Sequence, residues 1–390
     1  MNVLQIHNHY IFPGGEDTVA ASEASLLSSY GHHVFQYHRS NHELKGLPLV
    51  EQLKFYLQDI YFYKRVYKDL RKLIDQKKPD VAHCHNAFFL LGPAAYEACF
   101  DAGVPVVQTL HNYRFLCAAG TFFRNGHVCE DCVRQGRGAG IKYGCWHGFG
   151  ASFLMTRVIE TYEKRGLLDK ISSFIALSNF SRQKFLESGW NPKRMTVNGN
   201  FLEEDPGGVS FKGKHILYVG ALQEYKGIEV LLKAWGLSSK ALPLKVVGSG
   251  PMVSLFEDQF VKGIEYLGQK SSTEVMELIK DSLCVVIPSL CYENFPRVII
   301  EAYACGVPVV ASNLGALKEI VEDQKTGLLF EAHNMGSLSE KLDFLIQNPQ
   351  EASRMGKQAR AAFEQKYSKT RHYEIMMNIY QKAMHPEEDF

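Results

Sequence analysis

The sequence predicts an α/β protein with two doubly wound domains, and three observations support this class. Short β-rich segments alternate with helical segments over most of the 390 residues, which is typical of βαβ units and a parallel sheet. The alternation stops at a turn-forming cluster, Asp205, Pro206, Gly207 and Gly208, and then starts again. A hydrophobic content of 46% with 22% charged residues is that of a globular protein, so a disordered chain is excluded.

The alternation gives the elements in order along the chain. In the first half we expect strands at residues 3–7, 33–38, 81–85, 106–110 and 174–177, and helices at 17–30 and 52–73. In the second half we expect strands at residues 215–219, 244–247, 264–267, 284–287 and 307–311, and a helical C-terminus. We therefore predict an N-terminal domain at 1–205, a C-terminal domain at 206–370 and a C-terminal helix at 371–390.

Charge and cysteine content exclude several classes of protein. Lysine and arginine total 43 against 42 acidic residues, so nothing in the overall charge indicates a nucleic-acid partner. The chain has no apolar stretch approaching the ~18–20 residues that cross a bilayer and no signal-peptide pattern at its start. Nine cysteines are an odd number, mostly in apolar segments. We expect a reduced, cytoplasmic protein.

Two glycine-containing turns follow predicted strands. Gly14 and Gly15 precede a helix, where glycine lets the backbone approach a bound group and leaves amide donors at the helix start. The ordinary alternative is a tight turn with Asp17 as the N-cap. Gly248 and Gly250 resemble part of a dinucleotide fingerprint without its third glycine. This partial pattern is the basis of one alternative function, a dinucleotide-dependent oxidoreductase.

The segment from 289 to 301 holds the strongest candidate site. A loop after a buried strand carries Glu293, and a helix begins near 295–297 with Pro296 suited to its first turn. Glu301 lies further along that helix. Carboxylates accept hydrogen bonds from sugar hydroxyls, and the amides of a helix start suit phosphate. The ordinary alternative is a capping residue and a solvated glutamate, but the helix around Glu301 is apolar, so Glu301 is expected to need a partner.

These residues resemble a known signature. Glu293 and Glu301, with seven residues between them and an apolar segment after them, resemble the donor-site motif of the family 4 retaining glycosyltransferases. Further matches follow the family order along nearly the whole chain: Gly14-Gly15, 109–111, Asn200, 218–222, Lys226-Gly227, 247–251 and 266–268. The resemblance implies the GT-B fold, in which two Rossmann-like domains face each other across a cleft and the C-terminal helices pack back toward the first.

The resemblance also implies a role for each matched residue. Glu301 would bind the nucleotide ribose, and Glu293 the hydroxyls of the transferred sugar. Lys226 would neutralise the diphosphate with help from Gly15, and His111 would lie beside the sugar. The implied catalytic residues are thus His111 and Glu293. The implied donor-binding residues are Gly14, Gly15, Lys226, Gly248, Gly250, Gly268, Asn294, Phe295, Arg297 and Glu301.

The activity implied is a retaining hexosyltransferase of polysaccharide biosynthesis. It would move a sugar from a nucleoside diphosphate sugar, with UDP-glucose as the first choice, to a glycan or lipid-linked glycan.

The sequence departs from the family pattern at two positions. Ala221 stands where the family usually has arginine, and Pro296 has no N–H where many members have glycine. A non-catalytic nucleotide-sugar binding protein is therefore a second alternative.

No metal or cofactor is expected to be required for catalysis. The other common glycosyltransferase architecture binds Mn²⁺ or Mg²⁺ through an Asp-x-Asp loop, because the leaving diphosphate needs a hard cation. No two aspartates of this sequence stand two apart. Lys226 and the start of the helix after Glu293 would then stabilise the leaving group.

Two further segments allow more than one interpretation. Cys117, Cys129, Cys132 and Cys145, with His127 and His147 in reserve, include a Cys-x2-Cys pair suited to structural zinc. The outer cysteines are single, so free thiols or a labile disulfide are alternatives. Residues 52–73 are aromatic and basic, which fits either peripheral contact with an anionic membrane or a packed helix with a cationic solvent face.

Overall fold

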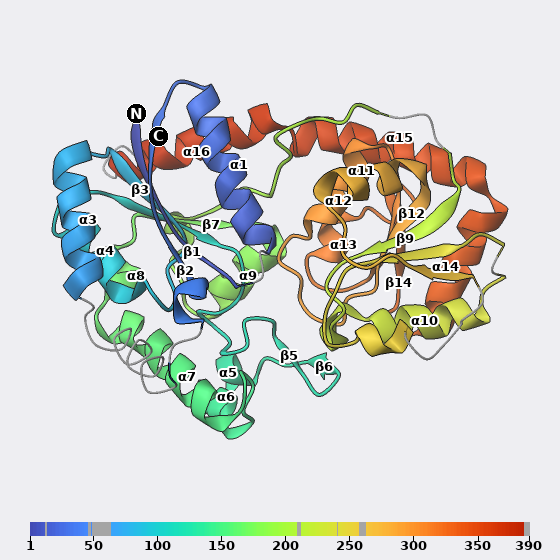
Figure 1. The fold of residues 1–390 in the computed structure, drawn as a ribbon, viewed down its shortest axis with the longest axis horizontal. Coiled ribbons are helices and arrows are strands. Elements are labelled where there is room, and N and C mark those ends of the chain that lie inside the picture. The colour runs from blue at the N-terminus through green and yellow to red at the C-terminus, as the bar shows by residue number, and fades with distance from the viewer. Residues whose placement is uncertain are drawn as a thin grey trace. The chain divides into compact units, whose positions relative to one another are not determined.

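The computed structural model describes residues 1–11, 14–45, 48, 64–208, 212–239, 241–256 and 263–385. These residues form two compact units. One consists of Met1–Thr121, Glu130–Gly199 and His372–Phe390, and the other of Phe122–Cys129 and Asn200–Arg371. Each unit contains a parallel sheet of its own (Figure 1).

In the first unit the described strands form a six-stranded sheet in the order β2-β1-β3-β4-β7-β8, and every neighbouring pair is parallel. The strands are β1 (Asn2–His9), β2 (His33–Ser40), β3 (Val81–Asn86), β4 (Val106–Leu110), β7 (Ser173–Ala176) and β8 (Met195–Val197). The helices are α1 (Gly15–Ser29), α3 (Lys64–Lys77), α4 (Gly92–Phe100), α5 (Asp131–Arg134), α6 (Gly138–Lys142), α7 (Phe149–Lys164), α8 (Leu167–Lys170), α9 (Asn179–Glu187) and most of α16 (Lys369–Met384). Strands β3 and β4 are buried along their whole length, as expected for inner strands of a sheet covered on both faces.

The second unit repeats this architecture. Its described strands form a six-stranded parallel sheet in the order β11-β10-β9-β12-β13-β14. The strands are β9 (His215–Val219), β10 (Leu244–Val247), β11 (Ile264–Tyr266), β12 (Ser282–Ile287), β13 (Val309–Ser312) and β14 (Gly327–Phe330), and a short antiparallel hairpin joins β5 (Phe123–Arg124) to β6 (His127–Val128). The helices are α10 (Ile228–Leu237), α11 (Ser272–Asp281), α12 (Arg297–Ala304), α13 (Leu317–Ile320), α14 (Met335–Gln347) and α15 (Pro349–Lys366).

The strand order of each sheet indicates where ligands are expected. In the first unit the chain adds β2 on one side of β1 and then crosses to β3 on the other side. In the second it adds β10 and β11 on one side of β9 and then crosses to β12. Doubly wound sheets bind ligands at the carboxyl ends of the strands beside such a reversal. The segments after β1, β3, β9 and β12 are therefore the ones that matter for function.

The α/β class with two parallel-sheet domains is confirmed, and each of the ten predicted strands is present within two residues of its predicted ends. The sequence did not predict β8 and β14. Each lies at the edge of its sheet and has only three or four residues. Both are defined by pairing with β7 and β13.

The compact units differ from the predicted domain ranges in three places. The C-terminal helix predicted at 371–390 is not a separate part, because residues from His372 onward belong to the first unit. Asp205 belongs to the second unit, because its carboxylate binds the Arg360 guanidinium with an Nη2–Oδ2 distance of 2.7 Å. The β5–β6 hairpin also belongs to the second unit, where the Phe123 ring lies 6.1 Å from the ring of Tyr225. Turn-forming composition marks a loop, and it does not mark the position where tertiary contacts change.

The basic aromatic segment at 52–73 is described only from residue 64 onward. Its described part belongs to α3, which buries Val66, Leu70 and Ile74 and leaves Lys64, Lys68 and other basic residues exposed. This part is a packed helix with a cationic solvent face. Residues 52–63 lie outside the described residues. Among the helices that are described, none combines the length and the apolar character needed to cross a membrane.

Candidate functional site

Lys226 and Glu293 form an ion pair in the second unit. Lys226 ends the 3-10 helix η3 (Glu224–Lys226), and Glu293 lies on the loop between β12 and α12. The Lys226 Nζ atom is 2.7 Å from Glu293 Oε1, and the Ser289 hydroxyl donates to the same oxygen at 2.6 Å. Burial disfavours the charge of Lys226, but the Glu293 carboxylate outweighs it and holds the pKa of Lys226 above its ordinary value. Lys226 is therefore a cation at neutral pH, as a diphosphate-binding residue must be.

The glycine after Lys226 fixes the position of the lysine. Gly227 has a φ of +72°, and a Cβ at this position would lie 1.8 Å from the carbonyl oxygen of Pro288, which follows β12. The backbone amide of Leu290 donates to the carbonyl of Tyr225 at 2.8 Å. The Lys-Gly pair in the sequence is thus explained by close packing of two loops, one carrying Lys226 and the other carrying Glu293.

The sequence predicts that Glu301 needs a partner without naming one, and in the structure that partner is Arg297. The two residues are four apart on α12, with 3.7 Å between Arg297 Nη2 and Glu301 Oε1, and each side chain is 20% exposed. Burial raises the pKa of Glu301 above its ordinary value, and the charge of Arg297 opposes this rise. The Arg297 Nε atom is buried and has no hydrogen-bond partner in the described part of the chain. This pair can therefore donate and accept further hydrogen bonds.

Asn294 and Phe295 are buried just before α12. Pro296 is the N-cap of that helix and not part of its first turn, so the helix begins at Arg297. The Phe295 carbonyl accepts a hydrogen bond from the side chain of Asn200 at 3.0 Å, and its ring lies 5.5 Å from the ring of Tyr367. The side chain of Phe295 thus packs within the second unit. Its backbone amide is left for the ligand contact predicted from the sequence.

Gly248 and Gly250 have a structural role that the sequence did not reveal. Their φ values are +144° and +155°, and a Cβ would lie 1.8 Å from the carbonyl oxygen of Gly220 or 2.5 Å from that of Leu222. The loops after β9 and β10 therefore pack backbone against backbone. Ala221 lies between these contacts, and its carbonyl accepts the Tyr218 hydroxyl at 2.9 Å.

Gly268 belongs to the same set of loops. Its carbonyl accepts a hydrogen bond from the Gly248 amide at 2.9 Å, and its φ is +68°. A Cβ at Gly268 would meet no atom within 4 Å. Its glycine is therefore required by backbone conformation and not by crowding.

In the first unit, Gly14 and Gly15 begin α1. Gly14 is the N-cap and Gly15 the first helical residue. The Gly14 amide donates to Asp17 Oδ2 at 2.7 Å. Asp17 is therefore not the N-cap that the alternative interpretation required, but the third residue of the helix, and its carboxylate bonds back to the cap.

His111 follows β4 and is partly exposed. Its Nε2 atom lies 3.0 Å from Nδ1 of His85, and the two rings stack with centroids 5.3 Å apart. Burial lowers the pKa of His111 to about 3, although the Glu23 carboxylate opposes this. At neutral pH His111 is an uncharged imidazole, suited to hydrogen bonding with a sugar hydroxyl and unsuited to binding phosphate.

A polar cluster beside His111 was not predicted from the sequence. The Asn112 side chain donates to Glu16 Oε2 at 3.4 Å, and Tyr10 also shares a hydrogen bond with Glu16. Burial raises the pKa of Glu16 to about 7, with the nearby charge of Arg114 opposing the rise. Glu16 follows Gly15, and Asn112 follows His111. The only signal in the sequence that could have identified this cluster is that Glu16 and Asn112 each follow a motif that matches the family pattern.

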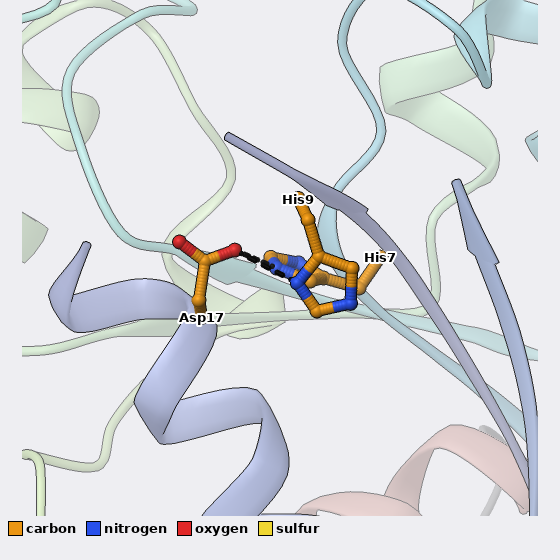
Figure 2. Close-up of side chains that lie close together, drawn as sticks. All are labelled: His7, His9 and Asp17. Atoms are coloured by element: carbon orange, nitrogen blue, oxygen red, sulfur yellow. Dashed lines mark hydrogen bonds and ion pairs between the residues drawn. The ribbon is translucent and has the colours of Figure 1, made fainter. Parts of the chain in front are cut away.

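Two sets of metal-capable side chains come together in the described part of the chain, both in the first unit. One consists of His7, His9 and Asp17 (Figure 2). The other consists of Glu23, His83 and His85, all of them buried. The predicted donor-site residues belong to neither set.

The four cysteines of the predicted zinc pattern are distributed over both units. Cys117, Cys132 and Cys145 belong to the first, and Cys129 to the second. All are free thiols. The Cys132 and Cys117 thiols share a hydrogen bond which, together with burial and the neighbouring Cys145, raises the pKa of Cys132. Structural zinc at these cysteines stays a prediction.

The two reserve histidines of that pattern also belong to different units. His127 is in the second unit, where its ring lies 5.3 Å from the ring of His333. His147 is an exposed residue of the first unit with a φ of +50°.

Comparison with protein families gives two matches that follow each other along the chain. Residues 13–205 match Glycosyltransferase Family 4, and residues 203–362 match the glycosyl transferases group 1. An uncharacterized glycosyltransferase of Methanocaldococcus jannaschii is 31% identical over 326 residues, which are 79% of this chain and 76% of that protein. A second one from the same organism is 29% identical over 94% of both chains.

Solved structures share the architecture. HepE of Anabaena, solved in complex with UDP and glucose, aligns with a TM-score of 0.70 and 18% identity, covering 98% of this chain and 100% of that one. At this identity the likeness shows the fold. The fold it shows is that of two Rossmann-like domains, each with a parallel sheet.

Proposed function

Because the chain belongs to the glycosyl transferases group 1 and has the GT-B fold, we propose that it is a retaining hexosyltransferase that uses a UDP-sugar, with UDP-glucose as the first choice. The carrying observation is the arrangement after β9 and β12. The Lys226–Glu293 pair joins η3, which follows β9, to the loop before α12, and the Glu301–Arg297 pair lies on α12 itself. HepE of Anabaena was solved with UDP and glucose, which supports this choice of donor.

In the proposed site two carboxylates, Glu301 and Glu293, contact different parts of the donor. Glu301 accepts the ribose hydroxyls, and Lys226 faces the diphosphate. The ammonium group has three N–H donors, so Lys226 can hold Glu293 Oε1 and a phosphate oxygen together. Lys226 then also orients Glu293 toward the sugar, where the Ser289 hydroxyl fixes the same oxygen.

The proposed reaction is a displacement at the anomeric carbon with retention. The bond from that carbon to the diphosphate oxygen breaks, the acceptor oxygen attacks from the same face, and the departing phosphate oxygen takes the acceptor proton. Lys226 and the amides at the start of α12 stabilise the charge that develops on UDP. Neutral His111 hydrogen-bonds a sugar hydroxyl and holds the anomeric carbon in place. No metal or cofactor takes part.

UDP affinity and turnover of three variants test this division of roles. Glu301→Ala should weaken UDP binding by about 1.5–3 kcal/mol, the range for a hydrogen bond to a charged group. Lys226→Ala should weaken UDP and UDP-sugar together, and more at low salt. Glu293→Gln should leave UDP affinity near that of the wild type and lower turnover, because its sugar contact strengthens in the transition state.

Glu277→Ala is the matched control, since Glu277 is an exposed glutamate on α11 of the same unit. It should change neither measurement. Calorimetry that finds unchanged UDP affinity for Glu301→Ala would remove Glu301 from the nucleotide site.

Hydrolysis of UDP-sugar by the wild type without acceptor distinguishes an enzyme from a non-catalytic binding protein. Family membership rejects the oxidoreductase alternative, and the glycines that motivated it are explained by loop packing.

The acceptor proposed is a glycan or lipid-linked glycan, reached by a cytoplasmic protein in peripheral contact with a membrane. The support comes from α6 and α7, where Tyr143, Phe149 and Phe153 are 44%, 68% and 40% exposed. Lys142 lies over the ring of Tyr143 and Arg157 over that of Phe153, and Arg157 also pairs with Glu160. Residues 132–159 contain no aspartate or glutamate. Exposed aromatic rings with adjacent cations suit an anionic lipid surface.

A further inference from the structure

His7, His9 and Asp17 meet where β1 ends and α1 begins. His7 Nε2 and His9 Nδ1 lie 2.9 Å and 3.0 Å from the same oxygen, Asp17 Oδ1 (Figure 2). The two histidines are two apart on β1, so their side chains leave the strand on one face. The three ligand atoms lie within 4.8 Å of one another.

The carboxylate of Asp17 is held in place from behind. Its other oxygen, Oδ2, accepts the Gly14 amide at 2.7 Å. This bond leaves Oδ1 directed at the two imidazoles. A hydrogen bond behind a ligand, which fixes the ligand's orientation, is the usual outer contact of a metal site.

The hydrogen bonds around His9 direct its Nδ1 atom at the carboxylate. Gln5 Nε2 donates to the Ala20 carbonyl at 2.7 Å, so Gln5 Oε1 is the acceptor for His38 Nε2 at 3.2 Å. His38 Nδ1 lies 3.2 Å from His9 Nε2. The Nε2 side of the His9 ring is therefore held by His38, and its Nδ1 atom faces Asp17 Oδ1.

We propose that His7, His9 and Asp17 bind a divalent transition-metal ion such as Zn²⁺. Two neutral imidazoles and a carboxylate are a ligand set for zinc and its first-row neighbours. Ligand atoms 2.9–3.0 Å apart fit adjacent positions around an ion with bonds of ~2.1 Å. The His9 side chain is 37% exposed, which gives the ion a path of entry and leaves further positions for water.

The second set, Glu23, His83 and His85, is the weaker candidate. His83 already bonds the Tyr380 hydroxyl and the Thr109 hydroxyl, each at 2.7 Å. Both histidines and Glu23 are no more than 3% exposed, so an ion would have no route in. An ion at His7, His9 and Asp17 instead clamps the end of β1 to the first turn of α1, which is a role in stability.

Metal binding by the full-length protein tests the proposal. Protein stripped with a chelator and dialysed should take up one Zn²⁺ per chain at this site, measured by calorimetry and elemental analysis. His9→Gln and Asp17→Asn should each lower the affinity by at least ~10-fold, as loss of a ligand does. His33→Gln, at an exposed histidine of the same unit, is the matched control and should bind like the wild type.

Cobalt distinguishes this site from the cysteines. Co²⁺ held by nitrogen and oxygen gives only weak ligand-field bands, whereas thiolate ligands add intense sulfur-to-cobalt charge transfer. Wild-type protein with Co²⁺ should show weak ligand-field bands that are lost in His9→Gln. This loss is expected whether or not the cysteines also bind an ion. Should His9→Gln keep the wild-type affinity and spectrum, or should the only bands be those of sulfur ligation, the proposal is overturned. It is equally overturned if no ion binds.

Circular dichroism and the melting temperature in chelator show that each variant is folded before binding is compared. His9→Gln is the decisive variant, since Asp17→Asn also removes a bond to the start of α1. None of these readouts depends on sugar transfer, so the outcome is independent of the proposed enzymatic function.

Discussion

Glu16 shows at the scale of one residue how burial changes charge. Its folded pKa is about 7 against an ordinary value of 4.5, mainly through burial. A raised carboxyl pKa means that the folded state favours the protonated form, so the stabilisation is complete below pH 4.5 and is lost as the pH rises to 7. We expect Glu16→Gln to become progressively more stable than the wild type between pH 4.5 and 7.

Urea unfolding at a series of pH values measures this difference in the free energy of unfolding. Glu374→Gln, at an exposed position on α16, should follow the wild type throughout. A constant difference between Glu16→Gln and wild type across this range would show that Glu16 has no raised pKa in the folded protein.

The loops after β9 and β10 give a prediction at the scale of the element. Gly248 has a φ of +144°, and a Cβ there would overlap the Gly220 carbonyl oxygen. Gly248→Ala should therefore destabilise the second unit by about 3 kcal/mol or more, through strain and steric overlap. Gly236→Ala is the contrast, because Gly236 lies in α10 and a Cβ there meets nothing within 4 Å. It should leave stability unchanged or raise it by up to ~1 kcal/mol. Thermal unfolding that shows equal effects would contradict the packing role of Gly248.

Helix α7 gives a second prediction at this scale. Phe149 is 68% exposed at its first position, and burying such a ring in lipid contributes about 1.5–3 kcal/mol. Phe149→Glu should weaken binding to anionic phospholipid vesicles by roughly 10-fold or more. Leu237→Glu changes an equally exposed apolar residue of the second unit and should bind like the wild type. Co-sedimentation with anionic and neutral vesicles measures both. Equal loss in the two variants would mean that α7 is not the contact surface.

For the whole molecule, the donor chemistry is expected to be independent of Mg²⁺ and Mn²⁺. The chain has no Asp-x-Asp sequence, and in the proposed site Lys226 with the start of α12 supplies the positive charge. EDTA should leave the initial transfer rate within about twofold of the untreated rate, since no ion is needed to polarise the diphosphate. A rate abolished by EDTA and restored by Mg²⁺ or Mn²⁺ would contradict the proposed donor site. The ion inferred at His7, His9 and Asp17 should affect melting temperature, not this rate.

The sequence determined the class of fold and the location of the candidate donor site. Alternating strands and helices are a local, periodic property, so ten strands could be predicted before any tertiary contact was known. The position of Glu293 on a loop and Glu301 on the next helix is equally local, because both follow one buried strand. Membership of the glycosyltransferase family agrees with the predicted fold class, and the donor site stays a prediction.

Tertiary structure decided which residues touch. The Lys226–Glu293 pair joins residues 67 apart in sequence, and the Asn112–Glu16 contact joins residues 96 apart. Gly248 is predicted from the sequence to bind the donor, and only the structure shows that it also packs against the Gly220 carbonyl. In the sequence, His7, His9 and Asp17 look like ordinary polar residues of a strand and of the helix after it. A local sequence pattern determines periodicity and helix capping. Charge partners, burial and shifted pKa values instead depend on which distant segments come together within each unit.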